Sequence, residues 1–137
     1  MLVVLDNNIL LSALISPHGA PHRIYEAWRQ GQFSVVTCRQ QVEEIRRASR
    51  YPRLRAILKP HLVGKMLNSI QRAQVFDDMP RRHAALDPED AYLLDLAELA
   101  NADYLVTGDK RSGLLNRRRI ARAKIVTAAT FCEKVLG

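Results

Sequence analysis

Long apolar runs are absent from this sequence, and none approaches the ~18 consecutive residues that a membrane-spanning helix needs. The first residues, MLVVLDNN, also lack the basic segment of a signal peptide and reach an acidic side chain at Asp6. They predict a buried strand instead. These absences lead us to expect a cytoplasmic protein with no membrane partner.

Cysteine, glycine-rich loops and aromatic residues are also scarce. Cys38 and Cys132 are the two cysteines and form no CxxC motif, so neither a disulfide framework nor a zinc site is expected. No glycine-rich phosphate loop occurs, which argues against a nucleoside triphosphatase. Aromatic residues make up 6% of the chain, so no obvious stacking platform for bases is present. Tyr51 and Tyr92 are candidates, but packing explains either more simply.

Acidic side chains are missing from two long stretches of this basic chain, whose net charge is +7. Eight basic residues and no acid lie between Ile45 and Phe76, and seven basic residues and no acid lie between Lys110 and Cys132. Such segregation is typical of a protein that binds a polyanion. A solvated basic surface, or a face for an acidic protein, is the alternative. The candidate nucleic-acid-binding residues are Arg46, Arg50, Lys110, Arg111, Arg117, Arg118 and Arg119.

Short apolar runs rich in β-branched residues alternate with helical patterns. The runs are continuous, as is typical of strands buried on both faces of a parallel sheet. The predicted strands are Leu2–Leu5, Ser34–Thr37, Tyr104–Thr107 and Lys124–Val126. The predicted helices are Pro21–Gln30, Arg39–Arg50, one opening at Pro60, one opening at Asp87-Pro88 and one following Thr127. We therefore expect one domain over residues 1–137, an α/β fold with a three-layer α/β/α sandwich and a mainly parallel sheet of four to five strands. Ser112–Gly113 and Arg117–Arg119 predict its most exposed loop.

Two acidic side chains directly follow predicted strands. Asp6 follows Leu2–Leu5, and Asp109 follows Tyr104–Thr107 after one glycine. Ligands of open parallel sheets bind beyond the carboxyl ends of the strands, so both acids are placed to meet there. A lone carboxylate at such a position is costly to desolvate without a partner, which a metal ion would supply. Alternatively, Asp6 caps a helix beginning at Asn7 and Asp109 is a turn residue.

A third acid, Asp90, lies at a predicted helix start with Asp87 as the N-cap. If this helix packs antiparallel to the next strand, Asp90 lies at the carboxyl end of that strand, near Asp109. A favourable interaction with the helix dipole is the simpler explanation of Asp90.

The fourth acid comes from the Glu43–Glu44 pair, which helical geometry separates. Val42 and Ile45 define the buried stripe of the helix, and Glu43 falls nearly opposite it among arginines. Glu44 falls on the border of the stripe, from which a side chain can reach the crevice. We therefore favour Glu44, with a solvated surface position as its alternative.

These motifs together resemble those of PIN-domain proteins, in the branch described as toxin components of toxin–antitoxin systems (VapC-like ribonucleases). The resemblance runs along the whole chain. It rests on LDNNIL at 5–10, VEEI at 42–45 before RYPRL at 50–54, DPEDAYLLDLA at 87–97, ADYLVTGD at 102–109 and KIVTAATF at 124–131. It implies that the catalytic and metal-binding acids are Asp6, Glu44, Asp90 and Asp109, supported by Asn8 and Thr107. Asn7 departs from the pattern, in which Thr is more usual.

The resemblance also implies a function. Hard oxygen ligands select Mg²⁺ or Mn²⁺, and the expected reaction is metal-assisted hydrolysis of RNA phosphodiester bonds. No histidine pair stands ready for cleavage through the ribose 2′-hydroxyl, so 5′-phosphate and 3′-hydroxyl ends are expected. The implied partners are an RNA substrate, a small antitoxin protein and a second copy in a homodimer. The rival hypothesis is a non-catalytic nucleic-acid- or partner-binding module on the same fold.

Overall fold

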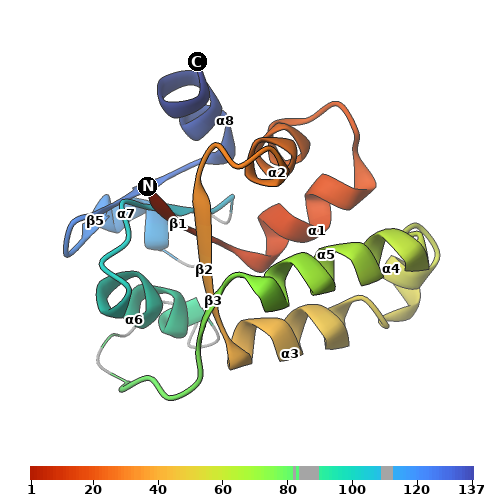
Figure 1. Ribbon diagram of the computed structural model, residues 1–137, viewed down its shortest axis with the longest axis horizontal. Helices are drawn as coiled ribbons and strands as arrows, with labels where there is room; N and C mark the ends of the chain where they lie inside the picture. Colours follow the sequence, from red (N-terminus) through yellow and green to blue (C-terminus); the bar gives the residue numbers. More distant parts are fainter. Residues whose placement is uncertain (82, 84–89, 109–112) are drawn as a thin grey trace.

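The computed structural model describes residues 1–81, 83, 90–108 and 113–137, and its described part contains one six-stranded sheet in the order β3-β2-β1-β4-β6-β5 (Figure 1). Neighbouring strands run parallel, except that β5 is antiparallel to β6. The strands are β1 (Leu2–Leu5), β2 (Ser34–Cys38), β3 (Gln74–Phe76), β4 (Tyr104–Val106), β5 (Arg119–Ile120) and β6 (Ala123–Val126).

Helices cover both faces of the sheet, which confirms the predicted three-layer α/β/α sandwich (Figure 1). They are α1 (Asn7–Ile15), α2 (Ala20–Arg29), α3 (Arg39–Ala48), α4 (Pro52–Arg55), α5 (Pro60–Arg72), α6 (Ala91–Leu99), α7 (Leu114–Arg117) and α8 (Ala128–Phe131), after which a π-helical turn spans Cys132–Leu136. Within the described part of the chain, no helix is both long enough and apolar enough to cross a bilayer.

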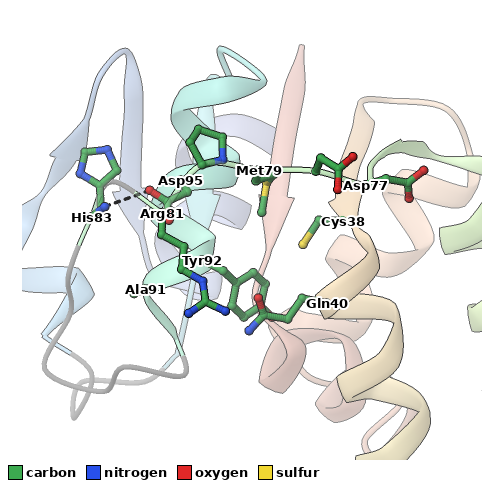
Figure 2. Close-up of a pocket in the computed structure, with 11 residues that line it drawn as sticks. Cys38, Gln40, Asp77, Met79, Arg81, His83, Ala91, Tyr92 and Asp95 are labelled. Carbon is green, nitrogen blue, oxygen red and sulfur yellow. Dashed lines mark hydrogen bonds between the residues drawn. The ribbon is translucent and has the colours of Figure 1, made fainter.

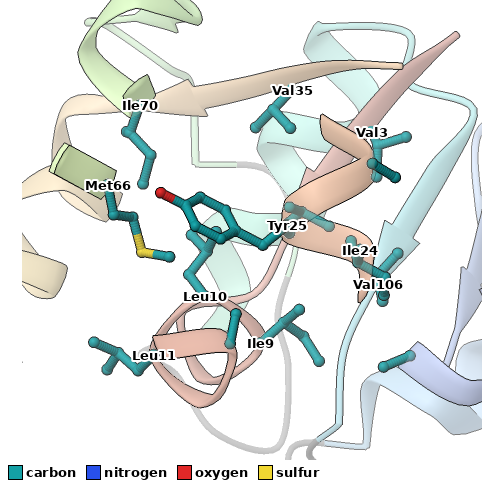
Figure 3. Close-up of a cluster of buried hydrophobic side chains, with 14 of the residues drawn as sticks. Val3, Ile9, Leu10, Leu11, Ile24, Tyr25, Val35, Met66, Ile70 and Val106 are labelled. Carbon is teal, nitrogen blue, oxygen red and sulfur yellow. The ribbon is translucent and has the colours of Figure 1, made fainter. Parts of the chain in front are cut away.

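The hydrophobic core has two parts, one on each side of the sheet, because successive strand residues point to opposite faces. On one face, Val3 of β1 packs with side chains of α1, α2 and α5, among them Leu10, Tyr25 and Ile70 (Figure 3). On the other face, Val4 packs with α6 and α7. Burial on both faces explains why the strands are continuous apolar runs.

The order of the strands creates a crevice next to β1. From β1 the chain moves outward to β2 and β3, and it then returns through α6 to β4 on the other side of β1. Ligands of open α/β sheets bind where the strand order reverses in this way, at the carboxyl ends. The backbone N–H of Asp6 donates to the carbonyl oxygen of Val106 at 3.0 Å, so the ends of β1 and β4 lie side by side.

Several local predictions differ from the structure. The strands β3 and β5 and the helix α4 are additional elements, and the helix beginning at Asn7, which the sequence offered only as an alternative, is present as α1. Arg117–Arg119 is not a loop: Arg117 ends α7, Arg118 has a left-handed backbone with φ of 64°, and Arg119 begins β5. The helix predicted to run from Arg39 to Arg50 ends at Ala48. The predicted N-cap Asp87 lies outside the described residues, and the described helix α6 begins at Ala91.

Candidate active site

Asp6 is a buried carboxylate at the carboxyl end of β1, with only 3% of its surface exposed. It is the N-cap of α1, and its Oδ1 accepts from the backbone N–H of Asn8 at 3.3 Å. Its Oδ2 accepts from the Thr107 hydroxyl, just beyond β4, at 2.7 Å. Both carboxylate oxygens are therefore held by groups from separate parts of the sheet edge, and the capping role left open by the sequence is observed.

Glu44 lies half-buried on α3 and is held by three donors. Its Oε2 accepts from the Asn7 side-chain amide at 2.8 Å and from the Tyr92 hydroxyl at 3.1 Å. Its Oε1 accepts from the Gln40 amide at 3.3 Å. The neighbouring Glu43 is exposed. The helix therefore turns Glu44 toward the sheet edge, while Glu43 faces solvent.

Tyr92 supplies one of these donors from α6, on the opposite face of the sheet from α1. Its side chain is buried, and burial together with the nearby Glu44 carboxylate raises the pKa of the Tyr92 hydroxyl. The hydroxyl therefore stays protonated at physiological pH and donates to Glu44. It also accepts from the Asn7 amide at 3.2 Å. The Oδ1 atom of Asn7 is buried and has no hydrogen-bond partner among the described residues.

Gln41 fixes the position of α3 against β1. Its side chain is 1% exposed, its amide donates to the Leu5 carbonyl at the end of β1, and its oxygen accepts from the Thr37 hydroxyl of β2. These contacts tie the first turn of α3 to two strand ends. With α3 held in this position, Glu44, one turn further along the helix, lies beside Asn7.

A cleft of about 500 Å³ brings three of the predicted acids together. Asp6, Glu44 and the half-buried Asp90, which immediately precedes α6, all contribute to its wall. Asn8 also lines it, whereas Thr107 is buried behind Asp6. The fourth predicted acid, Asp109, lies outside the described residues.

The donor set of this cleft suits a hard divalent cation. Its polar lining offers carboxylate and amide oxygens, and no histidine or cysteine is among its described lining residues. Such oxygen donors favour Mg²⁺ or Mn²⁺ over zinc. Within the described ranges, no three Asp, Glu, His or Cys side chains form a group that could hold a metal ion. Asp6, Glu44 and Asp90 therefore share a cleft without forming a closed cage.

The predicted basic residues lie in different places. Arg46 and Arg50 are exposed and line a neighbouring groove of about 480 Å³, and Arg47, which the sequence analysis did not select, lines both that groove and the acidic cleft. Arg117–Arg119 is exposed on α7 and β5 and does not line the cleft. Lys110 and Arg111 lie outside the described residues.

A second pocket of about 710 Å³ is lined by Tyr92, Cys38 and Asp95, among others (Figure 2). Gln40 lines both this pocket and the acidic cleft, and the Tyr92 ring lines the pocket while its hydroxyl reaches Glu44. The backbone N–H of His83 donates to Asp95 at 3.0 Å along its wall. Gln40 therefore lies where the two hollows meet, and Tyr92 links the wall of the second pocket to Glu44.

The comparison with protein families agrees with this fold. A family model described as "PIN domain" matches residues 2–111, and the chain therefore belongs to the PIN-domain family. PIN domains are generally nucleases that use divalent metals such as Mg²⁺, which makes the chain a hydrolase that acts on nucleic acid. Neither the search of curated proteins nor the search of solved structures found a match.

Proposed function

We propose that this protein is an endoribonuclease that depends on Mg²⁺ or Mn²⁺ and hydrolyses RNA phosphodiester bonds at the cleft formed by Asp6, Glu44 and Asp90. The observation that carries the proposal is the convergence of these acids from β1, α3 and the start of α6 on one cleft. This basic chain has fewer acidic than basic residues, and yet three acids meet at one place. That place is the carboxyl edge of the sheet where the strand order reverses.

The cation would be held by Asp6 and Asp90, together with Asp109 and Glu44, as the resemblance implies. Mg²⁺ commonly takes one or two carboxylates directly and keeps several waters, so the remaining acids can act through water. When bound, a divalent cation lowers the pKa of water and neutralises the charge that develops on the phosphate.

The chain's own residues orient this site. Thr107 and the backbone of Asn8 hold the two oxygens of Asp6, and Asn7 and Tyr92 hold one oxygen of Glu44. These carboxylates therefore keep their orientation when the substrate arrives. Arg47 offers a positive charge on the wall of the same cleft, where it can pair with a phosphate oxygen.

We expect products with 5′-phosphate and 3′-hydroxyl ends. All four histidines belong to the described residues, and none of them lines the acidic cleft. His22 faces the carbonyl of Ala13, and His83 lies beside Glu98 at the second pocket. Acid–base cleavage through the 2′-hydroxyl therefore lacks its usual groups, and hydrolysis by water is the reaction that the cleft supports.

We further propose that the protein is the cytoplasmic toxin of a toxin–antitoxin pair, that it forms a homodimer, and that a small antitoxin neutralises it. The support is the resemblance described above. An antitoxin could insert a basic side chain among the acids. Co-expression with the product of the adjacent gene tests this: loss of growth inhibition and co-purification of both chains are the expected results.

The decisive experiment is incubation with RNA in Mg²⁺, in Mn²⁺ and in EDTA, followed by analysis of the fragment ends. We expect cleavage that EDTA abolishes and that Asp6→Asn removes. Glu133→Gln is a matched control, because Glu133 is an exposed acid in the π-helical turn, away from the cleft. Binding of RNA without cleavage would favour the non-catalytic module, and 2′,3′-cyclic ends would contradict the hydrolytic reaction.

A further inference from the structure

The acidic cleft continues into a second groove on its α3–α4 side. Tyr51 and Arg47 line both hollows, so they form the border at which the cleft meets the groove of Arg46 and Arg50. Figure 1 shows that α3 leads directly toward α4 at one end of the molecule. A chain that entered the acidic cleft could therefore continue over Tyr51 without leaving the surface.

Tyr51 is unusual among the aromatic residues because it remains exposed. Its exposed fraction is 53%, whereas that of Tyr92, the other aromatic residue near the acids, is 6%. Tyr51 also belongs to neither hydrophobic cluster. Packing in the core therefore accounts for Tyr92 but not for Tyr51, which leaves the ring of Tyr51 free to contact a ligand.

The backbone of Tyr51 is nevertheless fixed. Its N–H donates to the carbonyl of Ala48 at 3.1 Å, and its own carbonyl accepts from Leu54 at 2.9 Å and from Arg55 at 2.8 Å. Pro52 follows and restricts Tyr51 to the extended conformation that it adopts, with φ of −62° and ψ of 137°. The ring is therefore presented from a rigid corner between α3 and α4.

The arginines around this corner are available for an anionic ligand. Arg29, Arg39 and Arg122 each form an ion pair with an acidic side chain, whereas Arg46, Arg47 and Arg50 form none with the other described residues. No acidic residue occurs from Ile45 to Phe76, and Glu43 is the only acid among the described residues that line the groove, beside three arginines. Charge and exposure together fit a phosphate backbone beside an aromatic ring.

We infer that Tyr51, with Arg46, Arg47 and Arg50, forms a binding site for an unpaired nucleotide next to the cleavage site. The base stacks on the Tyr51 ring, and the arginines bind the flanking phosphates. This inference rests on the proposed function, because it places the nucleotide beside the reacting phosphodiester. Base–aromatic stacking needs a base that is free of a partner strand, so the site selects single-stranded segments.

Binding without cleavage tests the site independently of catalysis. A labelled short single-stranded RNA of mixed sequence is titrated in EDTA, with fluorescence anisotropy as the readout, against the same sequence as a duplex. We expect Tyr51→Ala to weaken single-strand binding by about 5- to 100-fold, because one stacked base is lost. Tyr51→Phe retains the ring and should bind like the wild type. Duplex affinity should be the same for all three proteins.

The contribution of the arginines is measured separately, through the salt dependence of the RNA affinity. Arg50→Gln should reduce the slope of log affinity against log salt by about 0.7 for each phosphate contact that is lost with a single strand. The matched control is Arg23→Gln, because Arg23 is an exposed arginine on α2, away from α3 and α4. Its slope should equal that of the wild type.

The outcomes distinguish this site from the proposed function. Equal binding by Tyr51→Ala and the wild type would overturn the stacking site, even if the protein cleaves RNA in Mg²⁺. Displacement of the RNA by polyglutamate at equal charge concentration would also overturn it, because the groove would then accept any polyanion, including an acidic protein. Loss of binding in Tyr51→Ala with rescue in Tyr51→Phe supports the site, even if no RNA is cleaved.

Discussion

The side-chain amide of Asn7 donates to Glu44 at 2.8 Å, which links the first turn of α1 to the middle of α3 across the mouth of the cleft. The same amide donates to the hydroxyl of Tyr92, which itself donates to Glu44. The three side chains form a closed triangle of hydrogen bonds. Asn7 occupies a position where Thr is more usual in the PIN-domain pattern. In this chain its amide orients Glu44, one of the acids of the site.

Replacing Asn7 should therefore weaken metal-dependent cleavage without unfolding the protein. Groups that orient metal-binding side chains commonly contribute about 10- to 100-fold to metal affinity or activity, and we expect this range for Asn7→Ala. Asn7→Thr keeps a donor and should lose less. The measurement is the concentration of Mn²⁺ that gives half-maximal cleavage. Equal values for the wild type and Asn7→Ala would contradict the orienting role.

The raised pKa of Tyr92 gives the protein a specific loss of stability at alkaline pH. The folded state keeps the hydroxyl protonated while the unfolded tyrosine titrates near pH 10, so the folded state binds more protons above this pH. The contribution of the Tyr92 hydroxyl to the free energy of unfolding is complete below about pH 10. Above that pH it falls by about 1.4 kcal/mol for each further pH unit.

Urea denaturation between pH 8 and 11 of the wild type and Tyr92→Phe measures this effect. Tyr92→Phe should be less stable by about 1.5 kcal/mol at pH 8, because Glu44 loses a donor. Above about pH 10 the difference should narrow, since only the wild type must keep this group protonated. Tyr25, Cys38 and Cys132, whose pKa values are also raised, are present in both proteins. Parallel curves would contradict the burial of the hydroxyl.

The sequence predicted the strands that form the site because burial on both faces leaves a continuous apolar run. It also favoured Glu44 over Glu43, since the stripe of Val42 and Ile45 defines which side of α3 is buried. The sequence offered α1 only as an alternative, through the capping role of Asp6, and its hydrophobic pattern did not indicate the helix. Four residues of α1 are buried around much of its circumference, so the helix continues the apolar run of β1 without a clear amphipathic pattern.

The hydrogen bonds of the site could not be predicted in this way. Tyr92 and Asn7 are 85 positions apart, and Gln41 lies 36 positions from the Leu5 carbonyl that it binds. Their contacts depend on how α3 and α6 pack around the ends of the strands, and no local period reports such packing. Only the chemistry of Gln41 could have indicated such a contact, because the amide of a buried glutamine needs hydrogen-bond partners.

Thr107 gives a second test of how the acids are held. Its hydroxyl is buried and donates to Asp6 at 2.7 Å. Thr107→Val keeps the shape but removes the donor, and a hydrogen bond to a charged group is worth about 2 kcal/mol. We expect this loss in the free energy of unfolding in EDTA and at least about 10-fold weaker activation by Mn²⁺. Thr107→Ser retains the hydroxyl and should preserve both properties.

The choice between the adjacent glutamates of α3 can be tested directly. Glu44→Gln should reduce cleavage by at least about 10-fold, because a carboxylate that lines the cleft becomes neutral. Glu43→Gln should retain cleavage and bind RNA at least as tightly, since it removes a negative charge from the groove of Arg46 and Arg50. Comparison of kcat/KM for the two variants decides the assignment, and the reverse order would transfer the role to Glu43.

Asp6→Asn distinguishes the role of this carboxylate in metal binding from its role in stabilising the fold. The amide oxygen of Asn can still accept from the Asn8 backbone N–H and cap α1, while its NH₂ group takes the place of Oδ2 and can donate to the Thr107 hydroxyl. One negative charge fewer in the cleft also reduces repulsion among the acids. In EDTA the variant should therefore melt at the same temperature as the wild type or higher. Added Mn²⁺ should stabilise the wild type by about 2.7 kcal/mol at 100 times its dissociation constant. The variant should lose most of this gain, as followed by thermal denaturation across a Mn²⁺ titration. An equal gain in both proteins would show that the cation binds without Asp6, and the assignment of this carboxylate as a metal ligand would then be wrong.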